Sequence, residues 1–112
     1  MLSMMLDHID RHAEDPELSA VGLALKFHCS QRYVHKLFST TGRSVGEHIN
    51  GRRILVCTRN LLDHAHRHAT IAEIAFNAGF RDISYFNRLF KRSSGLAPRE
   101  FRRSMSPADS TR

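Results

Sequence analysis

The chain has 112 residues, 41% of them hydrophobic, and its 17 Lys or Arg against 11 Asp or Glu give a formal net charge of +6. This length suits one compact domain or two very small ones. No apolar stretch approaches the roughly 20 residues that a membrane-spanning helix needs, and the apolar start of the chain is too short for a signal peptide. We therefore expect a cytoplasmic protein.

The charge is distributed unevenly along the chain. Residues 1–18 hold five acids against one Arg, a balance of −4, which leaves 16 basic and six acidic residues, a balance of +10, for the remainder. A basic body this small indicates a polyanionic partner, with nucleic acid first. The alternative is an ordinary basic surface in contact with water. Cys29 and Cys57 are far apart and form no CxxC motif, which favours a reduced, intracellular setting.

Apolar residues recur at helical spacing along most of the chain, which predicts an all-α fold of about seven helices. The expected helices cover residues 2–13, 20–27, 31–41, 44–62, 71–78, 83–94 and 98–101. Hydroxyl and carboxylate side chains that can serve as N-caps precede five of them, at Ser19, Ser30, Ser44, Thr70 and Asp82. The long helix carries the apolar residues Val45, Ile49, Ile54, Leu55, Leu61 and Leu62. Residues 63–69 are expected to form a polar connector.

The sequence contains an internal repeat. Ser19 with Leu23-Ala24 aligns with Thr70 and Ile74-Ala75, Val34 to Phe38 aligns with Phe86 to Phe90, and Gly42 and Glu47 align with Gly95 and Glu100. The offset grows from 51 to 52 to 53, so each slip is one residue in a turn or loop. Each copy comprises a helix, a short turn, a second helix and a terminating Gly. This order predicts a helix-turn-helix motif that occurs twice.

The second helix of each copy has a polar outward stripe. It comprises Arg32, His35, Lys36 and Ser39 in the first copy and Ser84, Asn87, Arg88 and Lys91 in the second. Arg and Lys can bind guanine O6 and N7, and Asn can bind adenine N6 and N7. With one residue near the start of each helix, the candidate DNA-binding residues are Gln31, Arg32, His35, Lys36, Ser39, Arg81, Ser84, Asn87, Arg88 and Lys91. The alternative is that both stripes are solvated helix faces. Seven further arginines are expected to touch phosphates or face water: Arg43, Arg52, Arg59, Arg92, Arg99, Arg102 and Arg103.

The second half of the chain resembles the signature of AraC/XylS-type regulators. The matching segments are IAEIA at 71–75, GF at 79–80, DISYF at 82–86, RLFK at 88–91, GLAP at 95–98 and FR at 101–102. The resemblance implies two helix-turn-helix subdomains, 1–43 and 63–104, joined by a linker helix over 44–62 and followed by a polar tail over 105–112. It also implies that the chain reads two adjacent major-groove segments of double-stranded DNA and controls transcription, usually through contact with RNA polymerase.

Two features bear on this resemblance. His28 stands at the first turn, where that family often has Gly, so we expect a left-handed backbone there that His tolerates less well than Gly. Many members also carry a separate effector-binding or dimerisation domain. None fits in 112 residues, and we expect an excised C-terminal domain rather than a stand-alone regulator.

Two other functions remain open from sequence alone. One is a basic module that docks an acidic protein partner. The other is a His-rich metal protein, because the chain has eight histidines and three of them alternate at His64, His66 and His68. Zinc sites need three or four converging ligands, which a polar connector does not provide, so we expect no metal and no cofactor. No catalytic motif is present, and we expect no enzyme activity.

Overall fold

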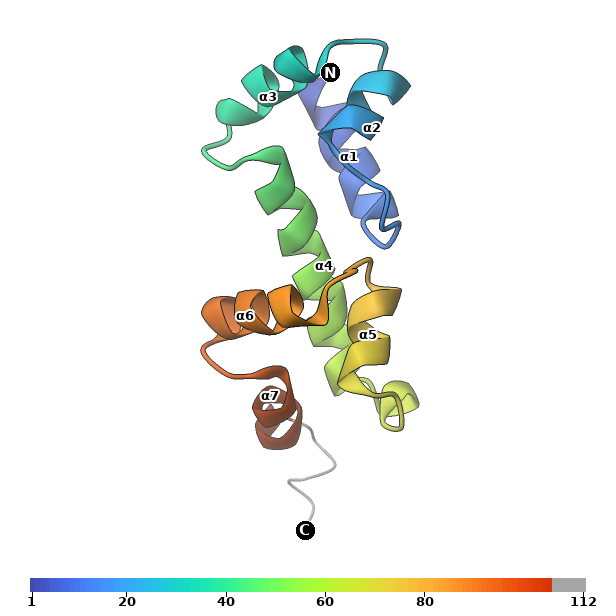
Figure 1. The fold of residues 1–112 in the computed structure, drawn as a ribbon, viewed down its shortest axis with the longest axis vertical. Helices are drawn as coiled ribbons and strands as arrows, with labels where there is room; N and C mark the ends of the chain where they lie inside the picture. The colour runs from blue at the N-terminus through green and yellow to red at the C-terminus, as the bar shows by residue number, and fades with distance from the viewer. Residues whose placement is uncertain (106–112) are drawn as a thin grey trace. The chain divides into compact units, whose positions relative to one another are not determined.

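The computed structural model describes residues 1–105, which contain seven α-helices, one 3-10 helix and no strand. This confirms the expected all-α fold. The helices are α1 (Leu2–His12), α2 (Ala20–Lys26), α3 (Gln31–Ser39), α4 (Val45–Leu62), η1 (His64–His66), α5 (Ile71–Asn77), α6 (Ile83–Ser94) and α7 (Pro98–Met105) (Figure 1). Helix α7 continues past its expected end at Phe101 and includes Met105. The rest of the expected polar tail lies outside the described residues.

The chain divides into two compact units, a first unit of Met1–Arg53 and a second unit of Ile54–Arg112. The division falls inside α4, so each unit takes part of its core from that helix. The core of the first unit is mainly aliphatic and consists of Met5, Ile9, Leu23, Ala24, Val34, Phe38, Val45 and Ile49. Burying a side chain of this size contributes about 1.5–3 kcal/mol.

The second unit has an aromatic core. Its buried residues are Cys57, Leu61, Ile74, Ala75, Ala78, Phe80, Phe86 and Phe90. The rings of Phe80, Phe86, Phe90 and Phe101 follow one another with centroid separations of 5.1, 5.7 and 5.3 Å. Burial among these apolar groups raises the pKa of the Cys57 thiol to about 12.

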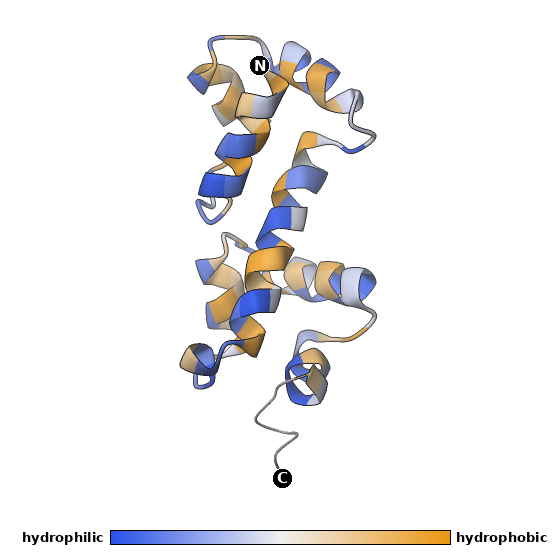
Figure 2. Cartoon of the chain, turned by 180° about the vertical axis from the view of Figure 1, so that it is seen from behind, coloured by the Kyte–Doolittle hydropathy of each residue, from blue (hydrophilic) through white to orange (hydrophobic). Residues whose placement is uncertain are grey.

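Helix α4 does not have a single apolar face. Its buried residues, Val45, Ile49, Arg53, Cys57 and Leu61, are spaced four apart. Since an α-helix turns about 100° per residue, this spacing moves the buried position around the helix by roughly 40° at each step. Figure 2 accordingly shows hydrophobic and hydrophilic residues alternating along α4.

This rotation leaves two apolar residues of α4 outside both cores. Leu55 and Leu62 are 47% and 36% exposed. Cys57, which was not assigned to the core, is fully buried. Within residues 1–105, no helix combines the length and apolar character needed to cross a membrane.

Candidate nucleic-acid interface

The first helix of each repeat begins with the same kind of N-cap. The Ser19 hydroxyl accepts a hydrogen bond from the Gly22 amide at 3.1 Å, and the Thr70 hydroxyl accepts one from the Glu73 amide at 3.0 Å. Glu73 also accepts a hydrogen bond from the Thr70 amide at 2.7 Å, which completes a capping box. Hydrogen bonds from the Thr70 backbone and, second, from the Thr70 side chain lower the pKa of Glu73. The caps fix where α2 and α5 begin.

The turn between the two helices is also the same in both copies. The Cys29 amide donates to the Ala24 carbonyl at 3.0 Å, and the Phe80 amide donates to the Ala75 carbonyl at 3.1 Å. The residue before each of these amides has a positive φ, 56° at His28 and 109° at Gly79. The expected left-handed backbone at His28 is therefore present. Cβ crowds the backbone in this region, so Gly suits the turn better than His does.

Each turn leads into a second capped helix. The Ser30 hydroxyl accepts from the Tyr33 amide at 3.0 Å, at the start of α3. The Asp82 carboxylate accepts from the amides of Ser84 and Tyr85 at 2.9 and 3.2 Å, at the start of α6. In each copy, this cap fixes where the second helix begins after the turn.

The repeat continues beyond the second helix. Both of these helices are followed by a Gly in the left-handed region, Gly42 at φ 81° and Gly95 at φ 85°. A glutamate then accepts a hydrogen bond from the backbone three residues before it. This is Ser44 to Glu47 at 2.7 Å in the first copy and Ala97 to Glu100 at 3.1 Å in the second. The start of α4 is thus the counterpart of α7.

One matching pair of rings was not found by sequence reasoning. Phe38 meets His48 and Phe90 meets Phe101, each with ring centroids 5.3 Å apart and edge to face. His48 and Phe101 stand at an offset of 53, so continuing the alignment one residue past Glu47 would have paired them. The Nε2 atom of His48 also lies 2.9 Å from the Thr41 hydroxyl. Partial burial, followed by the nearby Arg43 charge, lowers the pKa of His48.

All ten candidate DNA-binding residues are exposed. They lie on α3, on α6 or, for Arg81, just before α6, while Val34, Phe38, Phe86 and Phe90 of the same two helices are buried. Each helix therefore presents a polar outer face and an apolar inner face, as the periodicity predicts. The Ser39 hydroxyl donates to the Lys36 carbonyl at 2.6 Å, which leaves its oxygen as an acceptor for an outside group.

Two arginines bind the protein's own backbone. Arg53 donates through Nε to the Ala13 carbonyl at 2.7 Å and through Nη2 to the Asp15 carbonyl at 2.9 Å. Arg102 donates through Nη1 and Nη2 to the carbonyls of Ala69 and His66, both at 2.6 Å. The expectation that Arg102 touches phosphate or faces water is wrong. In each unit, an arginine fixes the segment that leads into the helix-turn-helix motif.

The histidine-rich connector provides no metal site in the described part of the chain. The Asp63 carboxylate caps η1 by accepting from the Ala65 amide at 3.0 Å, and it lies 3.3 Å from His66 Nδ1. Nowhere in residues 1–105 do three or more His, Cys, Asp or Glu side chains gather in a way that could hold a metal ion.

A helix, a tight turn and a second helix with an exposed polar face define a helix-turn-helix DNA-binding domain, and this chain contains the arrangement twice. Residues 23–104 match the family model described as "Helix-turn-helix domain". The chain is 32% identical over 95 residues to the transcriptional activator RhrA of Rhizobium meliloti, covering 85% of this chain and 30% of that protein. It is 37% identical over 101 residues to the transcriptional activator RhaS of Escherichia fergusonii, covering 87% of this chain and 35% of that protein.

Solved structures show the same fold. A Listeria innocua protein of unknown function superposes with a TM-score of 0.83 at 26% identity, covering 92% of this chain and 95% of that one. The C-terminal domain of the Geobacillus stearothermophilus response regulator AraT gives 0.79 at 24% identity, covering 88% and 80%. This chain belongs to the AraC-type helix-turn-helix family of DNA-binding transcription regulators. It spans about a third of the length of the curated relatives it matches.

Proposed function

We propose that this chain reads a specific sequence of double-stranded DNA by placing α3 and α6 in two adjacent major-groove segments. The observation that carries the proposal is the duplication. Both copies have corresponding caps, the same turn and a ring pair at corresponding positions, and both direct a polar stripe outward from a helix held by its apolar face. A solvated surface would not require two such matched scaffolds.

The two stripes differ in the bases they can select. Arg32, Lys36 and Arg88 suit guanine, whereas Asn87 suits adenine. We assign Gln31 and Arg81, near the starts of their helices, to phosphate contacts, which set register and affinity rather than sequence. The preferred site is therefore a pair of different elements and not a palindrome.

We further propose an organisation of two reading subdomains, 1–43 and 63–104, with residues 44–62 as the linker helix. At 1.5 Å per residue such a helix is about 28 Å long, close to the roughly 34 Å between major-groove segments on one side of B-DNA.

The function extends to transcriptional control through RNA polymerase, in the bacterial cytoplasm at the nucleoid. An effector or dimerisation domain in a longer protein would supply regulation. The supporting observation is that RhrA and RhaS are named activators and are about three times as long as the matched region.

Two measurements test the reading of DNA. A site chosen from a random library should bind with a steep negative dependence of log affinity on log salt. A flat dependence, or binding to an acidic protein in preference to duplex DNA, would favour the alternative of a protein-docking module. Inserting about five base pairs between the two elements should reduce affinity to that of one unit, and about ten should restore part of it. Equal affinity across the series would mean that only one unit reads DNA.

A further inference from the structure

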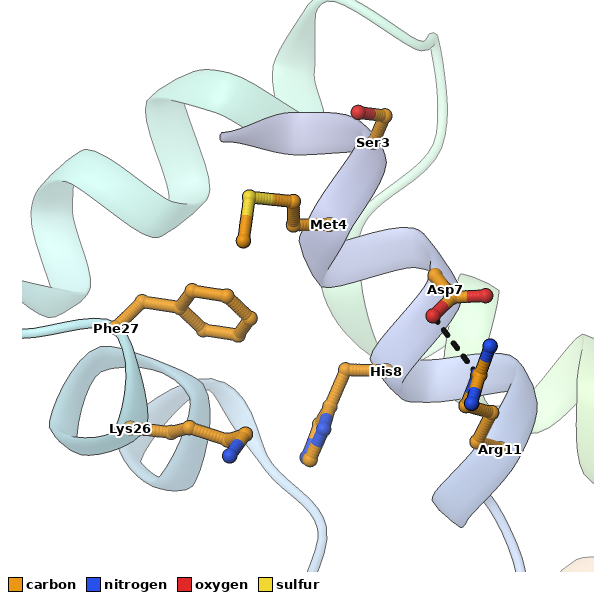
Figure 3. A pocket seen from close by; sticks show the side chains of 7 residues that line it. All are labelled: Ser3, Met4, Asp7, His8, Arg11, Lys26 and Phe27. Carbon is orange, nitrogen blue, oxygen red and sulfur yellow. Dashed lines mark ion pairs between the residues drawn. The ribbon is translucent and has the colours of Figure 1, made fainter.

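A hollow of about 610 Å³ opens between α1 and the end of α2, within the first unit and outside the proposed DNA-reading stripes. Figure 3 shows the side chains around it. The seven lining residues are Ser3, Met4, Asp7, His8, Arg11, Lys26 and Phe27. This volume lies within the range of small-molecule sites, and one apolar wall with a few charged groups at its rim is typical of them.

The apolar wall has the chemistry to hold a flat ring. Met4 is 61% exposed although it is large and apolar, and it points toward Phe27 in Figure 3. The Phe27 ring meets His8 edge to face at 6.0 Å, and His8 meets His12 with ring centroids 4.4 Å apart. Thioether sulfur and ring edges both make favourable contacts with an aromatic guest, and the flexible Met side chain can adapt to it.

The charges at the rim favour an anion. The Arg11 guanidinium is already paired with the Asp7 carboxylate at 2.9 Å, so these two charges offset each other. No ion pair joins Lys26 to a carboxylate within residues 1–105, and in Figure 3 its side chain reaches toward His8. One unmatched positive charge therefore stands beside the aromatic wall.

We propose that this hollow is a binding site for an aromatic monocarboxylate, with the ring between Met4 and Phe27 and the carboxylate against Lys26. This goes beyond DNA binding and does not depend on it. Burial, His12 and Lys26 together lower the pKa of His8, while Asp7 opposes them. A bound carboxylate would add a second negative charge near His8 and should raise that pKa.

The test is an NMR titration of the whole chain with 2-naphthoate. We expect a dissociation constant on the order of 1 mM for a ligand of about thirteen non-hydrogen atoms. The amide shifts should be confined to α1 and the end of α2, and the measured pKa of His8 should rise. The neutral isostere 2-naphthamide should bind more weakly, and so should acetate, which lacks the ring.

Variants separate the two halves of the site. Lys26→Gln should weaken 2-naphthoate by up to about fivefold, the range of an exposed ion pair, without changing 2-naphthamide. Met4→Ala should weaken both aromatic ligands. The matched control is Arg103→Gln, which removes an exposed cation from α7 in the second unit and should leave the titration unchanged. Equal effects of Lys26→Gln and Arg103→Gln, equal binding of acid and amide, or shifts spread over both units would overturn the proposal. Because Met4 and Lys26 are exposed, neither substitution should unfold the unit.

Discussion

The two units build the same motif with different residues at two corresponding positions. The second unit uses Gly79 in its turn and Phe101 in its ring pair, where the first unit uses His28 and His48. A glycine accepts positive φ without strain, and a phenyl ring packs without a charge that titrates near neutral pH. The comparison teaches that the scaffold tolerates polar substitutes at these positions. We expect the substitutes to lower the stability of the first unit and to make it depend on pH.

The largest expected effect is in the aromatic core. Phe90→Ala should cost about 3–5 kcal/mol of unfolding free energy, because Phe90 is fully buried and contacts the rings of Phe86 and Phe101. Thermal melting checks this, with amide hydrogen exchange to show that the loss falls on the second unit. Leu55→Ala, at a 47% exposed position, is the control and should cost far less. An unchanged melting temperature for Phe90→Ala would contradict the observed core.

The next largest effect is on DNA binding, and it tests whether both units read the DNA sequence. Arg32→Ala and Arg88→Ala should each weaken the preferred site by about 1–3 kcal/mol and relax the choice at one base position. The measurement is binding to the preferred site and to random duplex. Equal losses of affinity for both kinds of DNA would mean that the two arginines contact only phosphates. Arg102→Ala is the control. It should destabilise the fold and leave the salt dependence of binding unchanged, since Arg102 binds backbone carbonyls.

Substitutions at the two turn residues test the difference in backbone strain between the units. His28→Gly should stabilise the first unit by up to about 1 kcal/mol, because a side chain at positive φ costs about 1–2 kcal/mol and glycine's extra freedom in the unfolded chain offsets part of the gain. Gly79→Ala should destabilise the second unit by about 1–2 kcal/mol. Urea unfolding of both variants measures these shifts. A loss of stability in His28→Gly would mean that the imidazole contributes contacts that outweigh the strain.

The smallest expected effect is a pH dependence in the first unit. The folded pKa of His48 lies below its ordinary value of 6.5, so the unfolded chain binds more protons between the two values. The stability contribution is therefore fully present above about pH 6.5 and is lost as the pH falls below it. His48→Phe, which copies Phe101, should reduce this dependence, while His8, whose pKa is also lowered, retains a contribution of the same sign. Unfolding curves from pH 5 to 8 test this, and a dependence unchanged by His48→Phe would assign it elsewhere.

Much of the fold could be predicted because its signals are local. The caps at Ser19 and Thr70 and the inward Phe86 and Phe90 follow from helical periodicity and from residues within four positions. The failures involve distant partners. Arg53 hydrogen-bonds to Ala13, 40 residues away, and nothing near it in sequence marks it as buried. The exposure of Leu55 and Leu62 could not be predicted from periodicity either, because α4 supplies two cores and has no single apolar stripe.

For the candidate DNA-binding residues, too, only the local features could be predicted from the sequence. Exposure of Arg32 and Asn87 follows from the apolar positions opposite them, so the stripe itself could be predicted. The engagement of Ser39 with the Lys36 carbonyl could not, because a Ser hydroxyl in a helix can turn either to the backbone or outward. The ring pair of Phe38 and His48 needed the alignment to be carried one residue further.

The burial of Cys57 gives the second unit a chemical reporter of its own opening. A thiol with a pKa of about 12 has almost no thiolate at neutral pH, and full burial also keeps reagents away from it. Cys29 is only partly buried, so an alkylating reagent should reach it first. Modification of Cys57 then requires the surrounding helices to separate. Its labelling rate, followed by mass spectrometry, would measure how often the second unit opens while the rest of the chain stays folded.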